Sequence, residues 1–183
     1  EHYQIKTPVL SYHQHSKIQK IDYIIRLLRE GKNLALVSDA GTPGISDPGN
    51  KLINAIVDEA DLSERTVPVP GPSALTAAAS ISGFPMDRFL FLGFPPAKKK
   101  RRKFFEELLN SKYPVIFYES PHRIIRTLKE LSSFSESSVE IVVCRELTKK
   151  FETIYRGKIE KIIEEIEKDK IRGEFTVIAG KEK

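Results

Sequence analysis

The chain has 183 residues, enough for one large or two small domains with buried cores, and a formal net charge of +5. Six of the positive charges form one run over 98–103, and removing those six leaves a net charge of −1, so the basic character is local. The single cysteine, Cys144, excludes a disulfide framework and a cysteine-ligated zinc site; within the apolar run 139–144 it reads as a buried strand residue.

No apolar run reaches the length that spans a membrane, and the first residues carry no signal-peptide core. We therefore expect a cytoplasmic protein without a membrane partner. The chain begins with Glu1 rather than methionine, and its first strand-like segment, 8–12, has no helix before it. These two features predict that further residues precede Glu1.

Helical and strand patterns alternate along the first half. Apolar residues at helical spacing predict helices over 18–28 and 52–57, and the alanine-rich segment 73–82 is a third helix candidate. Short apolar runs predict strands at 34–37 and 65–69. An α/β class follows from this alternation.

The stretch 83–85 predicts a boundary between two lobes, 1–83 and 84–183. The second lobe repeats the alternation, but its last strands follow one another without a crossover helix, so we expect a mixed sheet. Its first predicted strand starts at Arg88, and the others cover 114–118, 139–144, 152–156 and 174–179. Its predicted helices cover 99–109, 121–131 and 159–166.

The sequence SDAGTPGISDPG at 38–49 directly follows the apolar run 33–37. A strand that opens into glycines and small hydroxylated residues leaves backbone polar groups uncovered where open α/β sheets bind ligands. Asp47 and Pro48 also fit a helix N-cap and first turn, although this explains only the end of the segment. The loop therefore predicts a small-molecule site.

Generic cofactor motifs are absent: neither G-x-G-x-x-G after the first strand nor the P-loop pattern occurs, which disfavours a dinucleotide dehydrogenase and a P-loop NTPase. His13 and His15 could face the same way from an extended segment. No third ligand lies beside them in the sequence, so we expect no metal site.

Five motifs in order, SDAGTPGISDPG, VPVPGPSALTAAASISGFP at 67–85, FYESPHR at 117–123, RELTKKFE at 145–152 and GEFTVIAG at 173–180, resemble the tetrapyrrole methylase superfamily, in its branch acting on small-subunit ribosomal RNA. The resemblance implies a two-lobed fold with a parallel-sheet N-terminal lobe, a mixed-sheet C-terminal lobe and S-adenosylmethionine in the cleft between them. It implies 2′-O-methylation of a cytidine ribose, in ribosomal RNA or the assembled subunit, by a homodimer. It also implies an earlier strand and loop that this sequence does not contain.

Carried over to this sequence, the resemblance places the cofactor beside the glycine loop, next to a hydroxyl-bearing residue of Pro-Gly-Pro-Ser and against an adenine slot. The implied cofactor residues are Asp39, Ala40, Gly41, Thr42, Pro43, Ile45, Ser46, Ser73, Tyr118, Phe175 and Thr176. Backbone donors, small residues and an apolar slot suit a zwitterionic amino acid joined to a flat purine.

Methyl transfer to a ribose hydroxyl needs aligned reactants and a base, or cations that stabilise the developing alkoxide. Charged residues of two motifs are the candidates, although a helix cap with an ion pair is an equal interpretation for Glu119 and Arg123. The candidate catalytic residues are Glu119, His122, Arg123, Arg145, Glu146 and Lys149.

Cations at a helix start are electrostatically unfavourable, which indicates an external anionic partner. Phosphate contacts from such a block would position RNA without reading its sequence. The candidate RNA-binding residues are Lys98, Lys99, Lys100, Arg101, Arg102 and Lys103. Two alternatives stay open: a superfamily methyltransferase for a tetrapyrrole or protein substrate, and a non-catalytic RNA-binding module.

Overall fold

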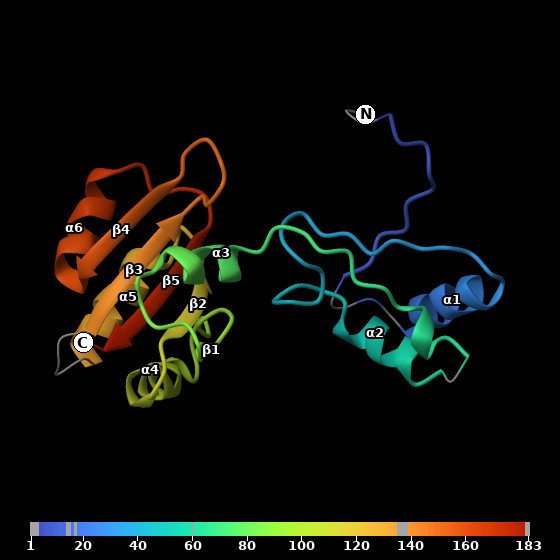
Figure 1. The fold of residues 1–183 in the computed structure, drawn as a ribbon, viewed down its shortest axis with the longest axis horizontal. Coiled ribbons are helices and arrows are strands. Elements are labelled where there is room, and N and C mark those ends of the chain that lie inside the picture. Colours follow the sequence, from blue (N-terminus) through green and yellow to red (C-terminus); the bar gives the residue numbers. More distant parts are fainter. Residues whose placement is uncertain (1–3, 14–15, 17, 60, 135–138, 182–183) are drawn as a thin grey trace. The chain divides into compact units, whose positions relative to one another are not determined.

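The computed structural model describes residues 4–13, 16, 18–59, 61–134 and 139–181. The chain divides into two compact units, Glu1–Pro72 and Ser73–Lys183 (Figure 1). Of His13 and His15, the pair considered as metal ligands, His15 lies outside the described residues.

The first unit is held by short helices. Helix α1 (Ile18–Arg29) and helix α2 (Asn50–Val57) form where the sequence predicts them, and the 3₁₀ helix η1 (Ser63–Arg65) follows. Gly31, with a φ of 81°, follows the end of α1, as a glycine after a helix end commonly does. Arg29 forms an ion pair with Glu59. The small core of the unit consists of Ile24, Ile25, Leu52, Ile56 and Leu62.

The strands predicted at 34–37 and 65–69 do not form, and the described residues of this unit contain no parallel sheet. A strand is stabilised when its backbone N–H and C=O groups pair with a neighbouring strand, and neither segment has such a neighbour among the described residues of the unit. Val37, Val67 and Val69 are accordingly exposed. Apolar composition alone predicted the segments but not their pairing.

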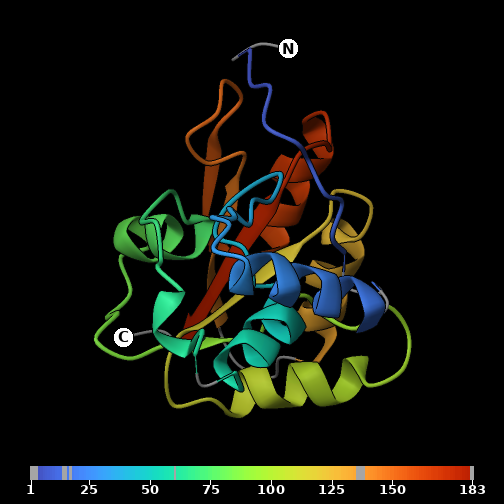
Figure 2. The same cartoon turned by 90° about the vertical axis from the view of Figure 1, so that its right-hand side faces the viewer.

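The second unit is built on the predicted mixed sheet (Figure 1). Its strand order is β1-β2-β5-β3-β4, in which β1 is parallel to β2 and the other neighbouring pairs are antiparallel. The long strand β5 is also visible in Figure 2. The strands are β1 (Leu90–Phe91), β2 (Val115–Glu119), β3 (Val139–Arg145), β4 (Thr153–Lys158) and β5 (Phe175–Lys181).

Helices cover the two faces of this sheet unequally. Helices α4 (Arg101–Asn110), α5 (Ile124–Phe134) and α6 (Ile159–Lys168) pack on one face around Phe105, Phe117 and other core residues. Helix α3 (Ala74–Ile81) packs on the other face through Ala78 and Ala79, which contact the smaller core around Ile116 and Ile178. This packing makes α3 part of the second unit, so the two compact units divide before Ser73. The domain boundaries 1–83 and 84–183 stay a prediction.

Candidate functional site

Both motifs with candidate catalytic residues reach the same edge of the sheet. Strands β2 and β3 both run antiparallel to β5, so their carboxyl ends lie at one edge together with the start of β5. The register places Glu119 opposite Phe175, Phe175 opposite Arg145, and Arg145 opposite Thr153. We call the side of the sheet where β2 and β3 end and β5 begins the carboxyl edge. Loops at the carboxyl ends of strands are the usual place for ligands in open α/β sheets.

Glu119 ends β2 as a buried carboxylate that is fully engaged by its own chain. Its Oε1 accepts a hydrogen bond from the Ser120 N–H at 2.7 Å and forms an ion pair with Arg123 Nη2 at 2.8 Å. Its Oε2 accepts a hydrogen bond from Thr127 Oγ1 at 2.7 Å. The side chain is completely buried, so the structure favours the ion-pair interpretation, in which Glu119 positions the turn after β2.

Arg101 joins the same network and is not part of the exposed basic surface. It donates hydrogen bonds to Glu130 at 2.6 Å, to the Pro96 carbonyl at 2.9 Å and to Thr127 at 2.9 Å. Only 7% of the residue is exposed. The prediction that Arg101 binds RNA is therefore corrected, because its guanidinium is occupied inside the fold.

Glu130 completes this network on helix α5. Burial alone would raise the pKa of Glu130, but hydrogen bonds from Arg126 and Arg101 lower it below its ordinary value. Arg123 reaches the same loop as Arg101, since its Nη1 donates a hydrogen bond to the Pro95 carbonyl at 3.0 Å. Two arginines thus anchor the loop that leads from β1 to α4.

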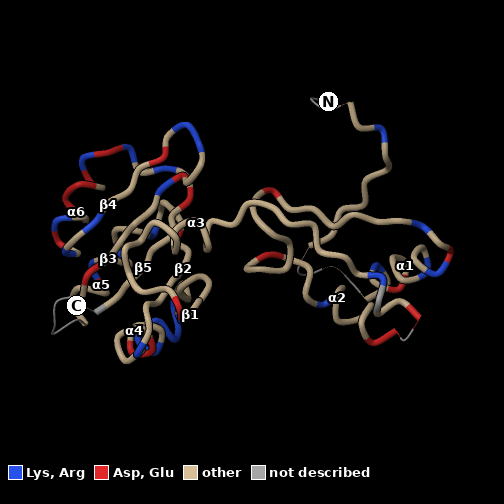
Figure 3. The backbone as a smooth tube through the Cα atoms, in the orientation of Figure 1, with Lys and Arg blue, Asp and Glu red and all other residues tan. Residues whose placement is uncertain are grey.

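The other cations of the basic block are exposed. Arg102 pairs with Glu106 one helical turn away at 2.8 Å. Lys100 has a φ of 68°, so the chain turns sharply into α4. Figure 3 shows this concentration of Lys and Arg at the start of α4. Within the described part of the chain, no ion pair is formed by Lys98, Lys99, Lys100 or Lys103.

Arg145, at the end of β3, is buried much as Glu119 is. It donates hydrogen bonds to Asp169 at 2.5 Å and to the Arg172 carbonyl at 3.0 Å. Tyr155 donates a hydrogen bond to the same Asp169 oxygen at 3.0 Å. The pKa of Asp169 is lowered, first by the backbone N–H of Lys170 and then by Tyr155 and Arg145. These contacts favour a structural role for Arg145, which fixes the segment before β5.

Glu146 and Lys149 lie in the loop between β3 and β4 and form an ion-paired cluster with Glu174. Lys149 Nζ lies 3.0 Å from Glu146 Oε1 and 2.7 Å from Glu174 Oε2. Its hydrogen bond to Glu174 is the main cause of its raised pKa, and the bond from Lys149 is the main cause of the lowered pKa of Glu146. Both groups are thus held charged, so neither is a suitable proton acceptor as it stands. His122, in the turn after β2, is exposed.

The predicted adenine slot is divided by the alternation of the strands. Phe175 belongs to the core on the α4, α5 and α6 face and is 2% exposed. Thr176 and Tyr118 pair across strands and point to the opposite face. The side chain of Phe175 is therefore committed to the core, because neighbouring residues of a strand point to opposite faces, and only its backbone is left for the predicted cofactor contact. Tyr118 and Thr176 stay predictions.

Tyr118 belongs to an aromatic group on the α3 face. Its ring centroid lies 5.0 Å from that of Phe91 and 5.6 Å from that of Phe94. Phe94 is 49% exposed and begins the loop that Arg101 and Arg123 anchor. Ser73 caps helix α3, since its Oγ accepts a hydrogen bond from the Thr76 N–H, which gives it a structural role beside the predicted one.

The glycine loop of the first unit is compact at one end and open at the other. A Cβ at Gly49 would lie 3.2 Å from the Gly44 backbone, so the loop closes on itself there. Gly41, in contrast, has a φ of 69° and open space where a side chain would project. Glycine is the residue that tolerates both conditions. The predicted cofactor residues Asp39, Ala40, Gly41, Thr42, Ile45 and Ser46 are exposed, and Pro43 is half-buried.

Sequence reasoning missed the residues that complete these networks. Thr127, Glu130 and Asp169 lie outside the quoted motifs, and only the fold brings them to the arginines. Phe151 and Arg172 were also missed, although Phe151 lies inside the RELTKKFE motif. An aromatic residue between charged neighbours in a predicted hairpin loop was the available signal for Phe151.

Comparison with known proteins gives the family. A family model for Tetrapyrrole (Corrin/Porphyrin) Methylases matches residues 1–163. The chain belongs to the tetrapyrrole methylase family. In the described part of the chain, no helix combines the length and the apolar character needed to cross a membrane.

Several curated relatives of this tetrapyrrole methylase carry the same name. It is 42% identical over 98% of its length to a Thermotoga maritima protein named "Ribosomal RNA small subunit methyltransferase I", of which it covers 80%. Relatives with that name from Synechocystis and Bacillus subtilis are 42% and 43% identical. The chain covers 64% and 59% of those two, so it spans less than two thirds of their length.

Solved structures support the fold of this tetrapyrrole methylase. The methyltransferase CobJ superposes with a TM-score of 0.62 at 19% identity, over 91% of this chain and 72% of CobJ. Uroporphyrin-III C-methyl transferase from Thermus thermophilus, solved with S-adenyl homocysteine, gives 0.54 at 16% identity, over 89% and 73% of the two chains. The predicted α/β fold of the superfamily is thereby confirmed.

Proposed function

We propose that this tetrapyrrole methylase transfers a methyl group from S-adenosylmethionine to the 2′-hydroxyl of a cytidine in small-subunit ribosomal RNA. The observation that carries the proposal is the identity of 42–43% to relatives named for ribosomal RNA methylation. The five ordered motifs lie between residues 38 and 180, within the length of chain that these relatives match. RNA as substrate also accounts for the exposed lysines before α4, which a small tetrapyrrole would not need.

The residues of the glycine loop fit the cofactor. S-adenosylmethionine carries a positively charged sulfonium that donates the methyl group. The exposed carboxylate of Asp39 and the uncovered backbone near Gly41 suit its charged amino-acid end. In the second unit, Tyr118 and Thr176 offer an aromatic ring and a hydroxyl on one face of the sheet. We assign cofactor binding to these two groups of residues.

The acceptor hydroxyl must lose a proton as the methyl group arrives. Lys149 keeps its charge because Glu174 and Glu146 raise its pKa, so its suitable role is to stabilise the developing alkoxide. His122 is exposed at the turn after β2 and is our candidate for the proton acceptor. From the interior, Glu119 positions the turn after β2, which carries His122, and Arg145 ends the strand that leads into the loop of Lys149.

Several features of the proposal concern the whole protein. Cytoplasmic location, a homodimer, and the choice between free ribosomal RNA and the assembled subunit all stay predictions.

The decisive experiment measures binding and product together. Titration calorimetry with S-adenosylmethionine tests the cofactor, and incubation of unmodified small subunits with the protein and S-adenosylmethionine, followed by complete digestion, tests the product. We expect 2′-O-methylcytidine among the nucleosides. Cofactor binding accompanied by methylation of uroporphyrinogen instead of RNA would overturn the substrate, and absence of cofactor binding would overturn the whole proposal.

The chain offers a matched pair of glycines for the same titration. Gly41 and Gly31 both have positive φ values, of 69° and 81°, and at neither would an added Cβ have another atom within 4 Å. Gly41→Leu fills the space that the cofactor would use, so we expect its affinity to fall about tenfold or more, whereas Gly31→Leu carries only similar backbone strain. Equal affinities of the two variants would remove Gly41 from the site.

A further inference from the structure

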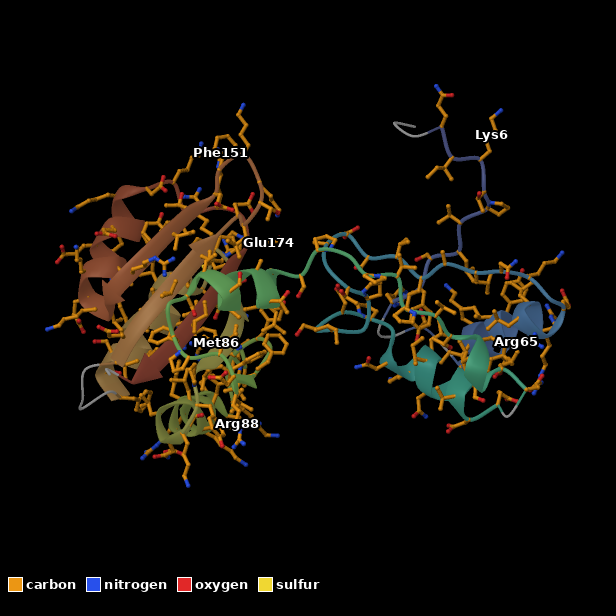
Figure 4. The ribbon with its side chains drawn as sticks, viewed as in Figure 1. Lys6, Arg65, Met86, Arg88, Phe151 and Glu174 are labelled. Carbon is orange, nitrogen blue, oxygen red and sulfur yellow. The ribbon has the colours of Figure 1, made fainter. Side chains whose placement is uncertain are left out.

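The loop between β3 and β4 presents an aromatic ring beside two cations. Phe151 is 49% exposed, and the Arg172 guanidinium carbon lies 4.5 Å from the centroid of its ring. Lys150 Nζ lies 5.7 Å from the same centroid. Figure 4 shows Phe151 at this loop, with Glu174 at the start of β5. Two cations thus lie close to one exposed ring, and each is attracted to its π face.

The loop holds its shape without the ring. Glu146 and Thr148 have positive φ values of 50° and 64°, conformations that cost free energy unless neighbouring contacts fix them. Glu146 Oε1 accepts hydrogen bonds from Lys149 and from the Glu174 N–H, both at 3.0 Å. Glu152 accepts a hydrogen bond from the Thr148 N–H at 2.6 Å. The ring is therefore displayed by a rigid loop and is not needed to build it.

The charged residues of 145–152 and 169–174 leave one cation in excess, since five cations stand against the four carboxylates Glu146, Glu152, Asp169 and Glu174. Glu146 and Glu174 are paired with Lys149, and Asp169 is paired with Arg145. Among the residues described in this loop and before β5, Lys150, Lys170 and Arg172 make no ion pair with a carboxylate. Aromatic rings and guanidinium planes are the surfaces on which unpaired nucleobases stack, and lysines beside them attract the phosphates.

We propose that Phe151 and Arg172 form a stacking site for a base of a single-stranded segment of the RNA substrate. This inference rests on the proposed function and adds a contact that none of the predicted site residues supplies. The site lies at the carboxyl edge beside β4, and the anchored lysine loop leaves the same edge beside β1. Four strand spacings, roughly 19 Å, separate β1 from β4, so an RNA strand of several nucleotides reaches both.

The chain contains no tryptophan, so a tryptophan placed at the site reports on stacking directly. Phe151→Trp is titrated with a short oligocytidylate and with the same ribose-phosphate chain lacking bases. We expect the oligocytidylate to quench the fluorescence and the abasic chain to leave it unchanged. Phe151→Ala should weaken oligocytidylate binding by about five- to 100-fold, as loss of one base stack does, and Phe151→Tyr should restore most of it.

Tyr113 and Arg88 provide the matched control. Tyr113 is 44% exposed and carries Arg88 at 5.9 Å, but both precede their strands and so lie at the opposite edge of the sheet. Tyr113→Trp should show no base-dependent quenching, and Tyr113→Ala should keep full affinity. Binding of RNA by Phe151→Ala with wild-type affinity would overturn the stacking site and leave the proposed function standing, whereas failure of the wild type to bind RNA would overturn both.

Discussion

Two neighbouring arginines of the basic block have opposite environments. Arg101 is buried against Thr127, Glu130 and the Pro96 carbonyl, whereas the side chain of Arg102 is 80% exposed and pairs with Glu106. We expect Arg101→Ala to lower the free energy of unfolding by about 2–4 kcal/mol, because it leaves buried polar partners unsatisfied. Arg102→Ala should change it by less than about 0.5 kcal/mol. Urea unfolding of both variants measures the difference.

The variants Arg101→Ala and Arg102→Ala also distinguish an effect on folding from an effect on RNA binding. Trypsin cleaves after the exposed lysines 98–100 if their loop is released, so Arg101→Ala should be cut there first while Arg102→Ala resists as the wild type does. Equal stability and equal cleavage of the two variants would contradict the buried role of Arg101. RNA affinity should fall modestly in Arg102→Ala, which removes one surface charge.

Cys144 gives a prediction for alkaline pH. Burial raises the pKa of its thiol from about 9 to about 11, with a smaller contribution from Glu152 that Arg156 opposes. Below pH 9 both the folded and the unfolded chain keep the proton, so the thiol adds no pH dependence. Between pH 9 and 11 only the unfolded chain loses it, so the free energy of unfolding should fall by about 2 kcal/mol.

Cys144→Ala isolates this contribution from the tyrosines and lysines that titrate in the same range. The variant loses packing at every pH, but its stability should fall less steeply than that of the wild type between about pH 9 and pH 11. Parallel curves would show that the thiol is not buried as described. The native thiol should also react slowly with alkylating reagents at neutral pH.

At the scale of the elements, periodicity predicted the helices and the strands of the second unit well. The register of β2, β5 and β3 then brought Glu119 and Arg145 to one edge, which their spacing in the sequence could not show. Two predicted site residues have side chains that are buried, and for the same reason. Phe175 and Arg101 carry residue types that suit a ligand, but their burial depends on which face of a strand or helix meets the core. The strands predicted in the first unit do not form, because a strand also needs a neighbouring strand with which to pair, and the sequence of one segment does not show whether it has one.

The loop between β3 and β4 depends on a close approach at Gly173. This residue has a φ of 88°, and a Cβ there would lie 2.5 Å from Glu146 Oε1. Gly173→Ala must displace Glu146 from its hydrogen bonds with Lys149 and Glu174. We expect a loss of about 1–3 kcal/mol and faster amide hydrogen exchange over residues 146–152.

Gly157 is the matched control for this element, since it also has a positive φ, of 123°, but has no atom within 4 Å of the added Cβ. Gly157→Ala should show only the backbone cost, about 1 kcal/mol, without faster exchange in the loop. If both variants accelerate exchange at 146–152 equally, the contact between Gly173 and Glu146 does not fix the loop. Phe151→Ala should leave exchange there unchanged.

On the scale of the whole molecule, the family assignment and the structure support the proposal at different levels. The curated relatives match this chain at 42% identity over 98% of its length, whereas the solved structures share the fold at 16–19% identity. The glycine loop lies in the first unit and the carboxyl edge in the second. The proposed activity needs both, so a variant of either set of residues should reduce methyl transfer while the other unit remains folded.

The salt dependence of RNA binding tests the exposed lysines as a group. Replacing Lys98, Lys99, Lys100 and Lys103 by glutamine retains the buried Arg101 and removes four exposed charges from one surface. If each contacts a phosphate of a single strand, the slope of log affinity against log salt should become shallower by about 3. Affinity at low salt should fall with it, because the same contacts supply the sequence-independent part of binding. The control replaces an equal number of exposed lysines on or beside α5 and α6: Lys129, Lys158, Lys161 and Lys168. Fluorescence anisotropy with a labelled fragment of small-subunit ribosomal RNA measures both sets, and equal slopes would show that attraction by overall charge, rather than the loop before α4, governs binding.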